Sequence, residues 1–153
     1  MESTLTAQEE ATESMDKVEL AITKSPPVDI PTEHLFTPGL YARTIRIKAG
    51  TLFTSMAHKT EHPFVISQGV IMVRSHVEGD NIYEAPHIGV TMPGTRRVLF
   101  AETNVVWTTF HATKETDVEK ICLEILDHRE NPLLKDKPEL VPGWRESLPH
   151  KKS

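Results

Sequence analysis

The sequence has little of what secreted, membrane-spanning or nucleic-acid-binding proteins are built from. Its one cysteine, Cys122, excludes a disulfide within the chain and fits a reducing compartment. No apolar run approaches the roughly 20 residues that cross a bilayer. The N-terminal stretch MESTLTAQEEATESMDK is acidic and polar, whereas a secretory signal is basic and then apolar. We therefore expect a cytoplasmic protein without a membrane partner.

An excess of basic residues is also missing. The chain has 17 Lys and Arg residues against 22 Asp and Glu residues, which gives a formal net charge of -5. General nucleic-acid binding depends on clustered cations that displace counterions, so this balance argues against a nucleic-acid partner. Cys122 falls in the apolar pattern VEKICLEIL, which predicts a buried small hydrophobe rather than a nucleophile.

The apolar residues that are present suffice for one core. A chain of 153 residues that is 38% hydrophobic fits a single domain with extensions. Residues 1–27 hold six acidic residues against two lysines, and we expect an irregular or helical N-terminal extension there. We expect residues 28–128 to form the folded domain. Residues 129–153, which contain four prolines, should form a Pro-rich tail.

Short runs of β-branched and aromatic residues, separated by turn residues, fill the central region. Such spacing is typical of an all-β protein. The runs lie at 40–49, 51–58, 62–68, 69–77, 81–86, 87–92, 95–101 and 104–112. Gly79 and Asp80 should make a tight hairpin link, and Pro93 with Gly94 another turn. Seven or eight antiparallel strands of this length predict a closed or double-sheet barrel, because one open sheet would expose its edges.

After residue 112 the spacing of the apolar residues changes from that of a strand to that of a helix. Thr116 and Glu119 have the spacing of a capping box, in which the threonine caps the helix and the glutamate reaches back. Apolar residues then recur at helical spacing up to Leu126. We expect one C-terminal helix from about Asp117 to His128, packed on the barrel.

Two histidines near the middle of the chain have the spacing of residues on one face of a strand. His58 and His62 are four positions apart, so an extended chain points both, with Thr60, to the same side. Lys59 and Glu61 then point away. Two neutral imidazoles on one face are a plausible half of a site for a transition metal.

His111 is the best candidate for a third ligand. It ends the run 104–112 in phase with Trp107 and Thr109, and that run should belong to the same barrel. Glu61 is a fourth candidate, because a bulge could turn its carboxylate inward. A histidine that stands alone is more often a surface or hydrogen-bonded core residue than a metal ligand, so the predicted site depends on all three coming together.

The same segment resembles the first motif of the cupin superfamily. Gly50 opens the motif and Gly69 closes it, which places His58 at the second histidine position and His62 at the glutamate position. Met56 stands where the first histidine is usual. The stretch MetProGlyThrArgArg approximates the second cupin motif, with Arg97 in place of the usual histidine.

A narrower resemblance is to small cupin-like proteins of tailed bacteriophages. It covers about residues 34–127 and is carried by the stretches 40–69 and 84–121, which include HisLysThrGluHis. The resemblance implies an all-β fold with one cupin-type double-stranded β-helix barrel, or jelly roll, and a metal held by the strand signature and His111. The resemblance to cupins in general implies a homodimer, and a phage-encoded protein would be located in the host cytoplasm.

Arg97 should line the barrel lumen, since it lies at a cupin ligand position and Arg96 must point to the opposite face. A guanidinium there would bind an anion bidentately, with Thr60 and Trp107 beside it. The alternative is an exposed arginine paired with Glu84 or Glu102.

Two functions follow from these predictions. The first is a small cupin-like protein that binds a divalent metal (Fe, Mn, Zn or Ni) or a small anionic ligand. The second is a metal-dependent enzyme of the oxygenase, isomerase or lyase type acting on a small anionic substrate. Whether the protein is an enzyme at all is left open by the sequence, which identifies no acid or base beside the metal.

Overall fold

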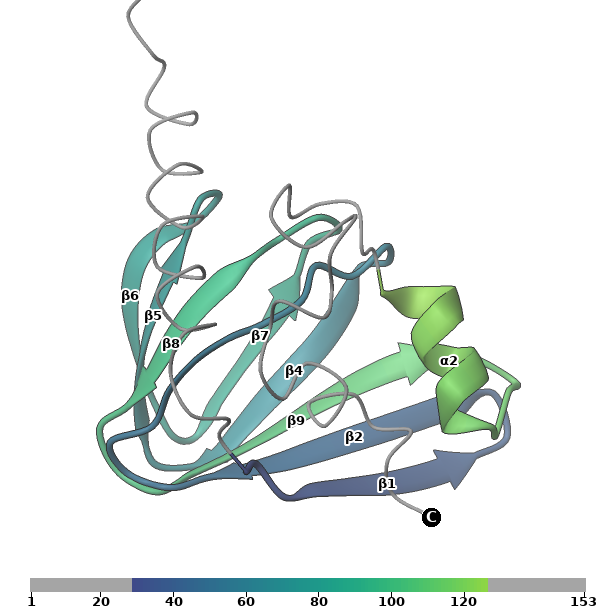
Figure 1. Cartoon of the computed structure of the whole chain (residues 1–153), viewed down its shortest axis with the longest axis horizontal. Helices are drawn as coiled ribbons and strands as arrows, with labels where there is room; N and C mark the ends of the chain where they lie inside the picture. Colours follow the sequence, from purple (N-terminus) through teal and green to yellow (C-terminus); the bar gives the residue numbers. More distant parts are fainter. Residues whose placement is uncertain (1–28, 127–153) are drawn as a thin grey trace, which may run out of the picture.

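The computed structural model describes residues 29–126, which form nine strands and one helix (Figure 1). The strands are β1 (Thr32–Thr37), β2 (Leu40–Ile47), β3 (Leu52–Thr54), β4 (His62–Gln68), β5 (Val70–Ser75), β6 (Gly79–Glu84), β7 (His87–Thr91), β8 (Arg97–Ala101) and β9 (Val105–Ala112). The helix is α2 (Val118–Ile125). The predicted extension at 1–27 and tail at 129–153 lie outside the described residues.

The strands form two antiparallel sheets. One has the order β1-β2-β9-β4-β7, and the other has the order β3-β8-β5-β6. Along the chain, β2, β3, β4 and β5 alternate between the two sheets, and the last strand, β9, enters the first sheet between β2 and β4. This is the double-stranded β-helix expected from the sequence, so the predicted fold class is confirmed. The two sheets face each other, and α2 lies beyond the end of β9 (Figure 1).

The core lies between the two sheets because the strands alternate in burial. Phe64 and Ile66 on β4 are 1% and 0% exposed, and Phe64 stacks on Trp107 of β9 at 4.6 Å between ring centroids. Ile71 and Leu99 close the core from the other sheet. Burial of each such side chain contributes about 1.5–3 kcal/mol.

Three local predictions need correction. The structure has an edge strand, β1, that the apolar pattern did not reveal, and the run 51–58 keeps only β3 in strand form. The β5–β6 turn consists of residues 76–78, and Gly79 already pairs with Ser75. The Ser75 hydroxyl accepts hydrogen bonds from the backbone N–H groups of Val77 and Glu78, so this turn is held by a serine instead of by a Gly-Asp pair.

The helix starts and ends inside its predicted bounds. Its N-cap is Asp117, whose carboxylate accepts hydrogen bonds from the backbone N–H groups of Glu119 and Lys120, so Thr116 is not the cap. Asp caps as well as Thr, and here it lies one residue closer to the apolar run. Cys122 is 4% exposed among Tyr41, Ile121 and Ile125, as predicted for a buried hydrophobe. No helix in the described range has the length and apolar character needed to cross a bilayer.

Candidate metal centre

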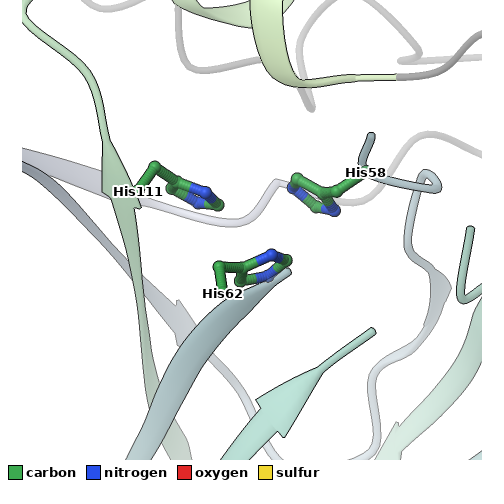
Figure 2. A group of neighbouring side chains, drawn as sticks. All are labelled: His58, His62 and His111. Atoms are coloured by element: carbon green, nitrogen blue, oxygen red, sulfur yellow. The ribbon is translucent and has the colours of Figure 1, made fainter. Parts of the chain in front are cut away.

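Three imidazoles converge at the end of the barrel that α2 covers (Figure 2). His62 is the first residue of β4, His111 lies near the end of β9, and His58 comes from the loop before β4. The ring centroids of His62 lie 4.5 Å from those of both other rings, and the His58 and His111 rings stack at 5.3 Å. One potential ligand nitrogen from each ring lies within 4.8 Å of the other two.

Two of the rings are oriented by hydrogen bonds. The Nδ1 of His62 lies 3.1 Å from the Thr60 carbonyl oxygen, which can only accept, so Nδ1 carries the proton and Nε2 keeps its lone pair. The Nε2 of His111 is 3.0 Å from the Thr109 hydroxyl, and its buried Nδ1 has no hydrogen-bond partner within residues 29–126. If Nε2–H donates to Thr109, the Nδ1 lone pair is available for a metal. Such outer hydrogen bonds are what fixes the tautomer of metal-bound histidine.

His58 reaches the other two rings by a route different from the predicted one. Residues 55–61 belong to no named strand, the chain bends at Lys59 and Thr60, and His58 forms an isolated bridge with Leu126 beyond α2. The Lys59 backbone N–H donates to the Ile125 carbonyl at 2.7 Å, and Gly94 donates to the His58 carbonyl at 2.9 Å. The helix end and the 93–94 turn therefore hold this loop, and the two histidines do not share one strand.

The three imidazoles are held in their neutral form. Burial lowers the pKa of His111 to about 3, assisted by the nearby His62 and by the positive charge of Arg43. Burial is also the largest cause of the lowered pKa of His58, with His62 and His111 contributing next. The pKa of His62 is lowered by burial too, although its hydrogen bond to Thr60 partly opposes the shift. Neutral imidazole is the form that binds a metal.

The lowered pKa values predict that the metal-free protein loses stability in acid. Above about pH 6.5 the three rings are neutral in both states, while below it the unfolded chain gains protons that the folded chain does not. Each ring then lowers the free energy of unfolding by about 1.4 kcal/mol per pH unit, until the pH reaches the pKa of that ring in the folded protein. Urea unfolding with chelator at pH 7.5 and 5 should show this loss, and His111→Gln should reduce it. His87→Gln is the matched control and should lose as much stability in acid as the wild type. If His111→Gln also loses as much as the wild type, the buried His111 ring is not a cause of the loss.

The arrangement fits a transition metal. The ligand nitrogens lie within 4.8 Å of one another, and a zinc ion with Zn–N bonds of about 2.0–2.1 Å would draw them closer by up to about 1.5 Å. His62 and His111 are 3% and 2% exposed, which keeps bulk water from two of the three donors. Three neutral ligands leave at least one coordination position open.

Of the four other predicted site residues, two line a cavity beside the histidines and two are exposed. Trp107 and Arg97 line the cavity next to the histidines, and their predicted contact with a ligand stays a prediction. Thr60 is exposed, and only its backbone carbonyl oxygen contacts the site, as the hydrogen-bond partner of His62. Glu61 is exposed and does not join the histidine group.

Arg97 is buried and firmly held. One guanidinium nitrogen donates to the Thr91 hydroxyl at 2.7 Å, and another donates to the Glu78 carboxylate at 3.0 Å. Its guanidinium also lies 5.0 Å from the Phe64 ring centroid. The alternative of an exposed Arg97 paired with Glu84 or Glu102 is therefore wrong. Glu78 and Thr91 carried no local sequence signal, because packing and register alone bring them to Arg97.

The cavity beside the histidines has a volume of about 140 Å³. Its walls come from both sheets and from α2, and they include His58 and His62. Arg43, Thr95 and Trp107 also line it. A ligand in this cavity would therefore lie against the histidine group.

No protein-family model and no curated protein sequence matches the chain. Salicylate 1,2-dioxygenase from Pseudoaminobacter salicylatoxidans, in adducts with gentisate, is similar with a TM-score of 0.51 and 16% identity. That match covers 76% of this chain but only 34% of the dioxygenase. An RmlC-like cupin family protein with a double-stranded β-helix fold from Methanocaldococcus jannaschii gives a TM-score of 0.47 and 10% identity, over 56% of this chain and 81% of that protein.

A cupin-2 domain containing protein from Shewanella frigidimarina gives a TM-score of 0.45 and 8% identity, over 54% of this chain and 80% of that protein. The solved structures that resemble this chain thus include cupin-family proteins. At identities this low the likeness concerns the fold alone, and the double-stranded β-helix rests on the strand order itself.

Proposed function

We propose that this protein is a small cupin-like protein that binds a divalent transition metal through His58, His62 and His111. The observation that supports the proposal best is the convergence of three imidazole nitrogens within 4.8 Å of one another, from three separate segments of the chain. Chance clustering of surface histidines would not account for it, because two of the three are buried and hydrogen-bonded in fixed orientations.

The donor set narrows the metal to a few ions. Imidazole nitrogens suit Zn, Fe and Ni, and also Mn in mixed sites, whereas Ca and Mg prefer oxygen ligands. No carboxylate of the described residues joins the group. When bound, such an ion supplies Lewis acidity, and in the case of iron or manganese also redox chemistry. The protein contributes neutral, oriented imidazoles and a cavity beside them.

The metal content of purified protein tests this proposal. Protein prepared without added metal should carry close to one equivalent of a transition metal by elemental analysis. The double variant His58→Ala, His111→Ala should carry almost none, because one remaining imidazole cannot hold the ion. His87→Ala, which removes a histidine outside the group, should keep its metal. Metal retained in full by the double variant would show that the ligands lie elsewhere.

The alternative function is a metal-dependent enzyme acting on a small anionic substrate. The cavity that adjoins His58 and His62 favours it, since it gives a substrate room beside the metal. Against it, none of the described residues that line the cavity is a carboxylic acid that could transfer a proton. Binding without turnover is therefore the simpler proposal. The cytoplasmic location, the phage origin and the homodimer expected from the sequence remain predictions.

A further inference from the structure

The loop that carries His58 also holds the C-terminal end of α2. The last four carbonyl groups of a helix have no partner within the helix. In α2 the Ile125 carbonyl accepts a hydrogen bond from the backbone N–H of Lys59 at 2.7 Å, and the Leu123 carbonyl accepts one from the Lys59 ammonium at 3.2 Å. Lys59 directly follows His58 in the chain. One residue therefore connects a proposed metal ligand to the end of the helix.

The Lys59 ammonium also supplies a charge that α2 lacks. The C-terminal end of a helix carries a partial negative charge, which a nearby cation stabilises. The last turn of α2 contains no basic residue. Lys59 places its ammonium against a carbonyl of this turn, although it lies 64 positions away in the sequence. Both the backbone and the side chain of Lys59 thus favour the docked helix.

The apolar face of α2 lies next to a second proposed ligand. Ile121 and Ile125 are buried in one cluster with Tyr41. Tyr41 on β2 is the cross-strand partner of His111 on β9, and the two rings lie 5.9 Å apart between centroids. The helix therefore meets the loop of His58 at its C-terminal end and the neighbour of His111 along its buried face, at the end of the barrel where α2 lies in Figure 1.

His58 is the ligand whose backbone the two sheets hold least. His62 and His111 belong to β4 and β9, which pair with each other and with a further strand on either side. His58 belongs to no named strand, and its backbone meets Leu126 only in an isolated bridge. A metal that draws the three nitrogens together would therefore move His58 more than His62 or His111. The hydrogen bonds of the loop would transmit such a movement to α2.

A helix as short as α2 depends on contacts of this kind. It has eight residues, and isolated helices shorter than about 12 residues are marginal in water. Elements with few buried contacts open locally at a lower free energy than core strands. The docking of α2 can therefore change while the barrel stays folded.

We propose that a metal bound by the three histidines and the docking of α2 stabilise each other, with Lys59 as the residue that couples them. The inference rests on the proposed function and deepens it, since it assigns a conformational response to the same site. Coupling of this kind is reciprocal. The metal fixes His58 and so keeps α2 on the barrel, while docked α2 keeps His58 in place for the metal. Lys59 is a positioning residue, because it acts on the metal through His58.

Hydrogen exchange of the full chain, measured by mass spectrometry with chelator and with saturating zinc, tests the coupling. The backbone amides of Val118–Leu126 should exchange at least about 5-fold more slowly with zinc, which is the lower end of typical coupling between two sites. The strand β6 is the internal control, because it is an edge strand of the other sheet. Its amides should change by less than about 2-fold, since an edge strand opens locally.

Variants separate coupling from mere support of the helix. Lys59→Pro removes both groups that bind α2, so the slowing by zinc should fall below about 2-fold, and zinc should bind about 5-fold or more weakly. Lys59→Met removes the ammonium alone and should reduce the slowing by about 2-fold or more. Asp117→Ala removes the cap at the other end of the helix. It should speed exchange of α2 in both solutions and leave the ratio between them unchanged.

The outcomes distinguish this inference from the proposed function. Equal slowing in α2 and β6, or slowing that survives unchanged in Lys59→Pro, would overturn the coupling. If Lys59→Pro does not fold, unchanged slowing in Lys59→Met has the same meaning. Zinc that binds at the three histidines without any effect on the exchange of α2 would overturn the coupling and leave the metal proposal standing. Wild-type protein that takes up no zinc would overturn both.

Discussion

Saturating zinc should raise the melting temperature of the metal-free protein by roughly 10 °C or more. An ion that binds only the folded state stabilises it by about 4 kcal/mol at a free concentration a thousand times its dissociation constant. For a domain of this size, each kcal/mol corresponds to several degrees. The stabilisation should be large because His58, His62 and His111 are already gathered and neutral, so the folded protein needs little rearrangement to bind.

His111→Ala should abolish most of this shift. The variant removes one of two buried ligands, and the remaining pair would bind zinc orders of magnitude more weakly. Calorimetry of the wild type, His111→Ala and His87→Ala with chelator and then with zinc checks the expectation. His87 is the matched histidine because it stacks on Tyr83 away from the group. A zinc shift that survives in His111→Ala but disappears in His87→Ala would place the ion elsewhere.

The sequence predicted the parts of the site that depend on local periodicity. His111 lies on the same face of β9 as the buried residues Val105 and Trp107, at even spacing from both, and this phase could be predicted from the sequence. His62 begins a regular strand, so its direction was also predictable. Gly69, which closes the motif, adopts a φ of 95°, and an added Cβ would clash with the Asn104 carbonyl oxygen. A glycine at that place was therefore a reliable marker of the fold.

What the sequence could not predict depends on contacts between distant segments. His58 joins the group because the end of α2 and a turn between β7 and β8 hold its loop, and no local pattern encodes that contact. Glu78 meets Arg97 because Ser75 shapes the β5–β6 turn, which sequence reasoning placed at Gly79. The strand β1 was missed since its inward positions are largely polar, as an edge strand allows.

The second large effect should appear when the buried pair of Arg97 and Glu78 is broken. Glu78→Gln leaves the guanidinium, whose side chain is 5% exposed, without its neutralising carboxylate. Loss of one partner of a buried ion pair lowers the free energy of unfolding by about 3–5 kcal/mol. Because Glu78 is partly exposed, we expect a smaller loss of about 2–4 kcal/mol here. Arg97→Met should cost a similar amount, because it removes the hydrogen bond to Thr91 and the contacts of the guanidinium with Phe64 and Trp107.

A double-mutant cycle measured by urea unfolding distinguishes this pair from an ordinary surface contact. Glu78→Gln combined with Arg97→Met should cost clearly less than the sum of the single variants, with a coupling energy of about 2 kcal/mol. The matched cycle on Arg74 and Asp80, whose side chains are 55% and 67% exposed, should give less than about 1 kcal/mol. If both couplings are equally small, Thr91 and the aromatic rings alone hold the guanidinium of Arg97. Glu78 would then be dispensable for keeping that charge at the cavity wall.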